Sequence, residues 1–267
     1  MANEQIIILK LGGSAITEKK SIRPRIKKTV VQQLAKELRL FLRRFPKTKI
    51  ILLHGAGSFG HPLVHRHKLL LQPLTKQKLQ GFTETVCSTR RLANLLTDIL
   101  RDEKLPVLPI QTSAVLCEKN NAMAILNIHN IRQLLDVGII PLLGGDMGLN
   151  AKKQAVVVSA DNLAVLLAKA FPLSRIIFAT NIDGVFDKFP PSGNMRPISL
   201  ISRKNLKRLL KKMREEKNQY DITGEMTGKL RTMLLLKEKE IVIFNGLMAG
   251  NLTRALIGKP IGTRLVI

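Results

Sequence analysis

The sequence predicts an α/β fold with a largely parallel central sheet, and three observations lead to that prediction. Apolar runs of four to seven residues alternate along the chain with longer segments of helical periodicity. Strands that alternate with helices are typical of parallel sheets, because each crossover helix covers one face of the sheet. The 267 residues are 45% hydrophobic, so the chain can bury a large core and does not have a disordered composition.

Up to Phe171 the alternation gives a regular series of elements. Buried strands are expected at residues 6–11, 49–53, 105–110, 138–143 and 154–158. Helices are expected at residues 29–45, 75–103, 130–138 and 161–170, with room for a short helix before the long one. A hairpin is expected over residues 115–126 with its turn at Asn120-Asn121. Ser159 is the expected N-cap of the helix at 161–170.

Phe171-Pro172 marks a boundary, after which the pattern restarts. Strands are then expected at residues 175–180 and 240–245. Helices are expected at residues 202–217, 226–239 and 250–257. The division predicts two lobes, residues 1–173 and residues 174–267.

The chain carries 44 Lys and Arg against 19 Asp and Glu, a formal net charge of +25. This balance attracts phosphates, but the basic residues are spread along the chain and many lie on predicted helix faces. With no Trp and one Tyr, base-stacking platforms are scarce, so a small polyanionic substrate is favoured over nucleic acid. No segment has the roughly 18 apolar residues of a membrane span. Cys87 and Cys117 lack metal or redox spacing, and we expect a cytoplasmic protein.

Two glycine-rich turns directly follow predicted strands. In KLGGS (10–14) two glycines let the backbone turn tightly and bring N–H groups to an anion, although a simple turn is the alternative. HGAGSFGHP (54–62) matches G-x-G-x-x-G, but no acid stands about 20 residues further on to hold a ribose. It favours a helix N-terminus that binds a phosphate, with His61 as a donor in the first turn. The other four histidines are expected to be structural or exposed.

Four later segments carry acids or a lysine at junctions between strands and helices. Asp146 in LLGGDMG (142–148) and Asp161 in VSADNLA (158–164) could orient lysines or water, or cap helices. In ATNIDGVFDK (179–188), Asp183-Gly184 forms a turn suited to a nucleotide. In DITGEMTGKLR (221–231), Lys229 lies in the first turns of a helix, where it can reach a transferring phosphate. No G-x-x-x-x-G-K-[ST] occurs, which excludes a P-loop enzyme.

Taken in order, these motifs resemble those of the amino-acid kinase superfamily: K-x-G-G-S, a second glycine turn, S-A-D-N, T-N-I-D-G-V and D-x-T-G-x-M-x-x-K. The resemblance extends from Ile6 to Thr263 and implies a three-layer α/β/α sandwich of two lobes. HGAGSFGHP is similar to the isopentenyl phosphate kinases, in which the histidine of G-x-F-G-H holds the acceptor phosphate. The resemblance therefore implies phosphoryl transfer from ATP to isopentenyl phosphate, with Mg²⁺ on the ATP oxygens, no protein metal site, and a homodimer.

The resemblance also implies a role for each matching residue. The catalytic residues would be Lys10, Lys19, His61, Asp161 and Lys229, with Asp161 holding Lys10 and Lys229 in place and Lys19 closing over the transferring group. The acceptor would be bound by Gly55, Ala56, Gly60, His61 and Ala160. ATP would be bound by Lys10, Gly12, Gly13, Ser14, Gly57, Thr180, Asp183, Gly184, Glu225 and Lys229.

Three positions depart from the family pattern. Ala56 and Ala160 each replace a usual glycine, which is tolerable if φ stays negative there. Glu225 replaces the second glycine of T-G-G-M, and an acid at that position would repel ATP unless it points away or helps bind Mg²⁺.

Several alternatives stay open at this point. The chain could be a kinase of another small phosphate or phosphonate, of the fosfomycin type, or an amino-acid or UMP kinase of the same fold. A nucleic-acid-binding protein built on the fold is the non-enzymatic alternative. An apolar substrate tail would lie along the helix at 78–100, beside Phe82, Val86 and Leu92, which could equally be ordinary core residues.

Overall fold

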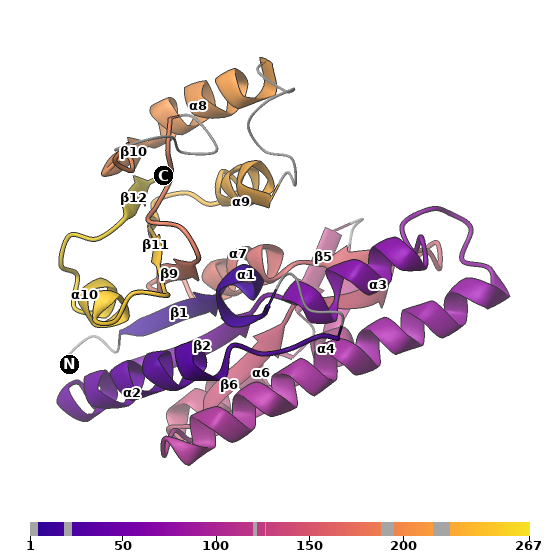
Figure 1. Ribbon diagram of the computed structural model, residues 1–267, viewed down its shortest axis with the longest axis horizontal. Coiled ribbons are helices and arrows are strands. Elements are labelled where there is room, and N and C mark those ends of the chain that lie inside the picture. Colours follow the sequence, from indigo (N-terminus) through magenta and orange to yellow (C-terminus); the bar gives the residue numbers. More distant parts are fainter. Residues whose placement is uncertain (1–4, 19–22, 120–121, 126, 188–194, 216–224) are drawn as a thin grey trace.

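The computed structural model describes residues 5–18, 23–119, 122–125, 127–187, 195–215 and 225–267. An eight-stranded sheet runs through the whole molecule (Figure 1). In spatial order its strands are β10 (Leu200–Ser202), β12 (Thr263–Val266), β11 (Glu240–Asn245), β9 (Arg175–Thr180), β1 (Ile6–Leu11), β2 (Lys49–His54), β6 (Ile140–Gly144) and β3 (Val107–Ile110). Neighbouring strands are parallel except β11 and β12, so the predicted largely parallel sheet is confirmed.

The central strands are apolar on both faces because helices cover both sides of the sheet. In β1 the side chains of Ile7 and Leu9 join the core on one face, and Ile8 joins the core on the other. Strand β2 alternates in the same way. These continuous apolar runs are what a parallel sheet buried on both sides requires.

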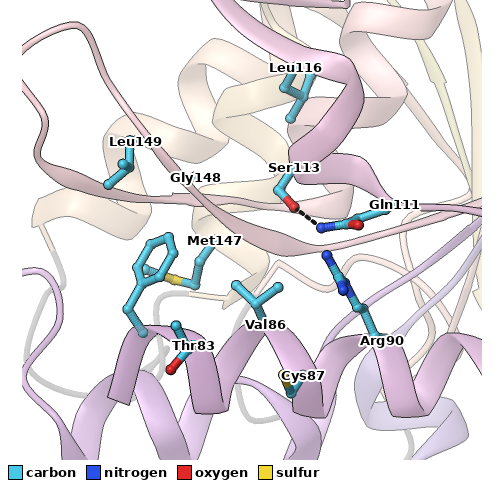
Figure 2. Close-up of a pocket in the computed structure, with 11 residues that line it drawn as sticks. Thr83, Val86, Cys87, Arg90, Gln111, Ser113, Leu116, Met147, Gly148 and Leu149 are labelled. Atoms are coloured by element: carbon cyan, nitrogen blue, oxygen red, sulfur yellow. Dashed lines mark hydrogen bonds between the residues drawn. The ribbon is translucent and has the colours of Figure 1, made fainter. Parts of the chain in front are cut away.

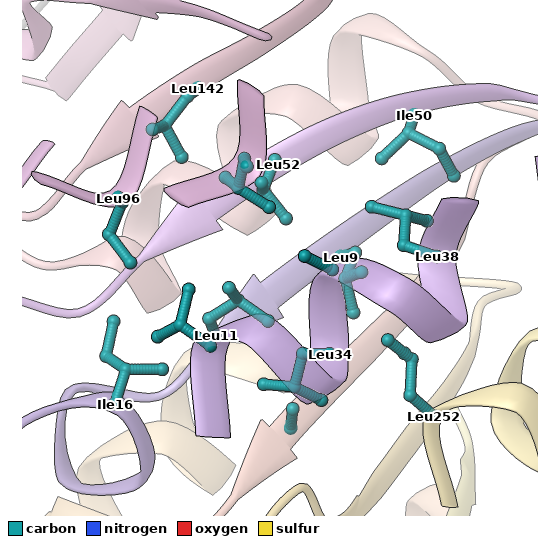
Figure 3. Close-up of a cluster of buried hydrophobic side chains, with 14 of the residues drawn as sticks. Leu9, Leu11, Ile16, Leu34, Leu38, Ile50, Leu52, Leu96, Leu142 and Leu252 are labelled. Carbon is teal, nitrogen blue, oxygen red and sulfur yellow. The ribbon is translucent and has the colours of Figure 1, made fainter. Parts of the chain in front are cut away.

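One face of the sheet is covered by α2 (Lys28–Arg44), α4 (Lys76–Asp102) and α10 (Asn251–Leu256). Figure 3 shows how Leu34 and Leu38 of α2 meet the side chains of β1 and β2, with Leu252 of α10 beside them. The helical spacing of the apolar residues in α2 predicted this buried stripe.

The other face is covered by four helices: α6 (Ile128–Asp136), α7 (Ala160–Ala170), α8 (Arg203–Glu215) and α9 (Glu225–Met233). The apolar residues of all four join one buried cluster with the second face of the sheet. Helices therefore lie on both sides of the sheet, and the three-layer α/β/α sandwich is confirmed.

Two antiparallel hairpins lie outside the central sheet. One pairs β4 (Leu116–Lys119) with β5 (Ala122–Ile125), as expected, while its predicted turn at Asn120-Asn121 lies outside the described residues. The other pairs β7 (Asp146–Leu149) with β8 (Ala155–Val158). The strand expected at 154–158 is thus present, but its partner is β7, not the central sheet.

The helix expected over residues 226–239 ends early, at Met233, and that prediction was wrong beyond this point. The guanidinium of Arg203 donates to the carbonyl oxygens of Leu236 at 2.6 Å and Leu234 at 2.9 Å. These bonds satisfy carbonyl groups where the chain leaves the helix to enter β11.

Short helical turns make up the remaining elements. They are α1 (Gly13–Ile16), η1 (Gly57–Phe59), α3 (His61–Arg66) and α5 (Thr112–Val115). Only α3, the short helix before α4, was expected from the sequence. Strand β1 pairs directly with β9, so the sheet continues across the predicted lobe boundary after residue 173. Among the described helices none combines the length and apolarity needed to span a membrane.

Candidate active site

The two N-terminal glycine turns lie against each other. They follow β1 and β2, which are parallel neighbours with Leu11 opposite His54. A Cβ on Gly13 would lie 2.5 Å from the Gly57 nitrogen, and one on Gly55 would lie 2.5 Å from the Gly13 nitrogen. Glycine is required here because backbone packs directly on backbone.

Thr17 links the two turns and was missed by the sequence reasoning. Its buried hydroxyl donates to the Gly13 carbonyl at 2.7 Å and accepts from the Ser58 amide at 3.1 Å. The sequence feature that could have indicated this link is the spacing of four residues between Gly13 and Thr17. In a helical turn a threonine hydroxyl can reach the carbonyl of residue i−4.

Lys10, Asp161 and Lys229 form one ionic cluster. The Nζ atoms of Lys10 and Lys229 lie 2.6 and 3.0 Å from the same carboxylate oxygen, Asp161 Oδ1. Both lysines are buried, one at the end of β1 and the other on α9. The implied contact of Asp161 with both lysines is present, and the capping position at this junction belongs to Ser159, which accepts from the Asn162 amide.

Phe178 forms the floor beneath both ammonium groups, which the sequence did not reveal. The centre of its buried ring lies 5.5 Å from Lys10 Nζ and 5.2 Å from Lys229 Nζ. The face of an aromatic ring attracts cations and excludes water, so it holds two like charges close together.

The cluster shifts the titration of its members. Burial lowers the pKa of Lys10 to about 8, the charge of Lys229 acts in the same direction, and Asp161 opposes both. Burial acts to raise the pKa of Asp161, but the two lysine charges outweigh it and hold that pKa at about 2. Asp161 is therefore ionised at neutral pH and fixes the lysines electrostatically.

His61 begins α3 and is exposed, with no hydrogen-bond partner among the described residues. Ala56 has φ −66°, so its replacement of the usual glycine is compatible with the backbone. A Cβ on Gly60 would come 2.6 Å from the Ala56 Cβ, which leaves room for only one methyl group between them. Ala160 is buried in the first turn of α7, where a helical residue has a negative φ, so alanine in place of the usual glycine is compatible with the backbone there too.

The candidate nucleotide residues lie at the ends of β9 and β11. Asp183 Oδ1 accepts from Asn245 Nδ2 at 2.9 Å. The buried Thr180 hydroxyl lies 2.9 Å from the carbonyl oxygens of Ile182 and Phe244, and so supports the turn from inside. Gly184 packs against Thr263, whose Oγ1 would lie 2.6 Å from an added Cβ.

Other predicted contacts of this region are only partly described. Ser14 Oγ donates to Asn181 Oδ1 at 2.9 Å, which connects the first glycine turn to the end of β9. Gly12 donates its N–H to the Ala179 carbonyl at 2.8 Å. Lys19 lies outside the described residues, and Glu225 is the first residue of α9. Within the described ranges, no group of three His, Cys, Asp or Glu residues could hold a metal ion.

Asp146 is a buried acid that stands apart from the lysine cluster. It accepts from the Thr89 hydroxyl at 3.1 Å, from the Ser113 amide at 3.2 Å, and from its neighbour Met147. The sequence left open whether Asp146 orients lysines or water or caps a helix. Its bond to the Ser113 amide matches the capping role, because Ser113 lies in the first turn of α5.

A pocket of about 530 Å³ lies between α4, α5 and the β7–β8 hairpin (Figure 2). Phe82 and Val86, two of the three residues predicted to lie beside a substrate tail, line this pocket. Leu92 does not, because it is fully buried in the core against the sheet. The structure therefore assigns Leu92 to the core alternative and corrects its place beside the tail.

The chain belongs to the amino acid kinase family, whose model matches residues 5–245. Its relatives include isopentenyl phosphate kinase from Methanothermobacter thermautotrophicus, 31% identical over 97% of this chain and 98% of the relative. Isopentenyl phosphate kinase from Methanocaldococcus jannaschii is 28% identical over 97% of this chain and 98% of its own. A solved structure of isopentenyl phosphate kinase shares 29% identity with a TM-score of 0.81, covering 97% of this chain and 99% of that one.

Proposed function

We propose that the chain transfers the γ-phosphoryl group of ATP to isopentenyl phosphate, giving ADP and isopentenyl diphosphate. The observation that carries this proposal is the pair of buried lysines on one carboxylate, beside two glycine turns in contact. Transfer between two anions needs positive charge and exposed N–H groups at one point, and little covalent chemistry from the protein. The relatives from Methanothermobacter thermautotrophicus and Methanocaldococcus jannaschii, both matched over nearly their whole length, are isopentenyl phosphate kinases, which supports this acceptor.

In this mechanism Lys10 and Lys229 stabilise the charge that develops on the transferring phosphoryl group. Asp161 keeps both ammonium groups in place, so the site needs no rearrangement when the transition state forms. The acceptor oxygen is already ionised, so no general base is required. Lys19 is proposed to add a third charge over the transferring group.

The glycine turns are proposed to position the two phosphates in line. Gly12, Gly13 and Ser14 face the ATP phosphates, and Gly57 lies between donor and acceptor. Because no side chain separates the turns, backbone N–H groups of both can approach a single reaction centre.

The acceptor is proposed to bind at Gly55, Ala56, Gly60, His61 and Ala160. The ring of His61 is exposed and has no hydrogen-bond partner in the described part of the chain, so it is free to donate to that phosphate. The isopentenyl tail would then lie in the pocket against Phe82, Val86 and Met147, where each buried CH₂ contributes roughly 0.8 kcal/mol.

The nucleotide is proposed to bind on residues 174–267, through Thr180, Asp183, Gly184, Glu225 and Lys229. Mg²⁺ is proposed to bind with the nucleotide and to be held mainly by the phosphate oxygens of ATP. Bound there, Mg²⁺ would neutralise phosphate charge. We also propose a homodimer, which light scattering of the purified chain would test.

The test is ADP release with Mg·ATP and five acceptors: isopentenyl phosphate, dimethylallyl phosphate, fosfomycin, UMP and N-acetylglutamate. We expect kcat/KM to be highest for isopentenyl phosphate, with isopentenyl diphosphate identified by mass spectrometry. Turnover of UMP, N-acetylglutamate or fosfomycin in preference to both prenyl phosphates would overturn the proposal. Retention of the chain on RNA without any turnover would favour the nucleic-acid alternative.

A further inference from the structure

The pocket beside α4 has an apolar wall and a polar end. Phe82, Met147 and Leu149 are among its apolar lining residues, and Figure 2 shows Met147 and Leu149 on the same side of it. Arg90, Gln111 and Ser113 gather at the other side. Gln111 and Ser113 are hydrogen-bonded to each other, so a purely hydrocarbon tail would use the apolar wall and leave the exposed Arg90 guanidinium to solvent.

Arg90 is the charged group of the polar end. Figure 2 shows its side chain extending from α4 toward Gln111. Within the part of the chain that the structure describes, no carboxylate lies within ion-pairing distance of Arg90. A guanidinium presents a planar set of donors that matches a carboxylate, so Arg90 can bind an anion brought by a ligand.

The polar end is held in place by a partly buried hydrogen-bond network that centres on a buried acid. Gln111 Nε2 donates to Ser113 Oγ at 2.7 Å, and the Ser113 amide donates to Asp146 Oδ2 at 3.2 Å. Asp146 is buried and also accepts from Thr89, the residue before Arg90 on α4. Asp146 therefore ties together the elements that carry all three polar groups, so this end of the pocket is fixed before a ligand arrives.

The pocket is also larger than an isopentenyl group requires. Five carbons occupy about 150 Å³ if each takes roughly the 30 Å³ of a water-sized group. The pocket holds about 530 Å³. Space therefore remains beyond a five-carbon tail for a further polar group and its water.

We propose that this site also phosphorylates alkyl monophosphates whose far end carries a carboxylate, with the Arg90 guanidinium binding that carboxylate. The inference rests on the proposed kinase function and extends its acceptor class. In the reaction the bond between the γ-phosphorus and its bridging oxygen breaks, and that oxygen leaves on ADP with the electron pair. An oxygen of the acceptor phosphate forms the new bond to phosphorus, and the carboxylate is unchanged.

The test compares two acceptors of equal carbon number, pentyl phosphate and 5-phosphonooxypentanoate. The measured quantity is kcat/KM for the carboxylate divided by kcat/KM for pentyl phosphate, in the wild type, Arg90→Gln and Arg91→Gln. Arg91 is the matched control, because both arginines are exposed on the same helix and only Arg90 lines the pocket. We expect Arg90→Gln to lower the ratio by about 2- to 5-fold, as for loss of a solvent-exposed ion pair, and Arg91→Gln to leave it near the wild-type value.

Each outcome decides between the two proposals. If isopentenyl phosphate is phosphorylated and 5-phosphonooxypentanoate is not, the inference fails and the proposed function stands. If isopentenyl phosphate is not phosphorylated at all, the proposed function fails. If Arg90→Gln lowers kcat/KM for both acceptors equally, Arg90 acts on the shared phosphate, and the inference is overturned. An equal fall of the ratio in Arg91→Gln overturns it as well, because general surface charge would then explain the effect.

Discussion

Lys10 and Lys229 place their ammonium groups on the same oxygen of Asp161, at 2.6 and 3.0 Å, above the ring of Phe178. Two like charges remain together at this point because the carboxylate and the ring offset their repulsion. Under the proposed mechanism a doubly anionic phosphate would meet both cations at once, which makes the pair the centre of the expected chemistry.

Removing either lysine should lower kcat without unfolding the chain. We expect Lys10→Ala and Lys229→Ala each to lower kcat by roughly 10²–10³, the loss typical of one preorganised charge-stabilising group. Lys169→Ala, at an exposed position on the helix that carries Asp161, is the matched control. Near-wild-type turnover of either site variant, with a normal melting curve, would contradict the proposed position of the transferring group.

Activity should fall on the alkaline side through the titration of Lys10. Its pKa is lowered to about 8, so the free enzyme loses this charge as the pH rises through that value. We expect kcat/KM for ATP to decline above a pH of about 8, because this quantity reports ionisation in the free enzyme. The charge of Asp161 raises the pKa of Lys10, so Asp161→Asn should move the decline to lower pH. An alkaline limb at the same pH in both proteins would exclude Lys10 as its source.

His61 should act on the acceptor and not on ATP. His61→Ala should raise KM for isopentenyl phosphate and lower kcat, with KM for ATP nearly constant, because the ring both holds and aligns the acceptor phosphate. His61→Gln and His61→Asn keep a neutral donor and should retain more activity than His61→Ala. His65→Ala, on an exposed turn of the same helix, is the control. A His61→Ala enzyme with normal affinity for the acceptor would rule out this role.

Phe82 and Leu92 lie on the same helix but should respond differently to truncation. Phe82→Ala enlarges the pocket and should improve kcat/KM for longer prenyl phosphates, at roughly 0.8 kcal/mol for each additional buried CH₂. Leu92→Ala opens a cavity in the core and should lower the free energy of unfolding by about 2–5 kcal/mol without changing chain-length preference. Steady-state kinetics and urea unfolding of both variants separate the two effects. Unchanged preference in Phe82→Ala would return Phe82 to a packing role.

His54 should make stability depend on pH. Burial lowers its pKa from 6.5 to about 4, so between these values the unfolded chain binds a proton that the folded chain does not. Stability is therefore lost as the pH falls through this window, by roughly 3 kcal/mol at 1.36 kcal/mol per unit. His54→Gln cannot titrate, so the fall in unfolding free energy between about pH 6.5 and pH 4 should be smaller in the variant by that amount. An equal loss of unfolding free energy between these two pH values in wild type and variant would contradict this role of His54.

The central strands could be predicted because their apolar runs are unbroken. The ranges expected for β1, β9 and β11 are the ranges observed. An apolar run does not indicate which strand it will pair with. Residues 154–158 have the composition of a strand, and only the tertiary structure pairs them with β7. The end of α9 was missed for a similar reason, since the guanidinium of Arg203 binds the carbonyl groups there from another helix.

The candidate site was predictable where glycine or charge marks a strand end, as at Gly13 and Asp161. Phe178 and Thr17 could not be found in that way, because each has an ordinary sequence context and acts through contacts with distant segments. Helical period alone also could not separate Phe82 from Leu92. One faces the hairpin β7–β8 and the other faces the sheet, which depends on how α4 packs.

Because the main chains of Gly13 and Gly57 are in contact, the distance between the two glycine turns is set by the register of β1 and β2. No side-chain rotamer can adjust the gap between the turns, so the spacing of the two proposed phosphate sites would follow directly from Leu11 standing opposite His54. Core side chains on one face of β1 and β2, such as Leu9 and Leu52, would then contribute to the proposed catalytic alignment through packing alone. A packing change that displaces one strand by a fraction of an ångström would slow turnover before it noticeably loosened the fold.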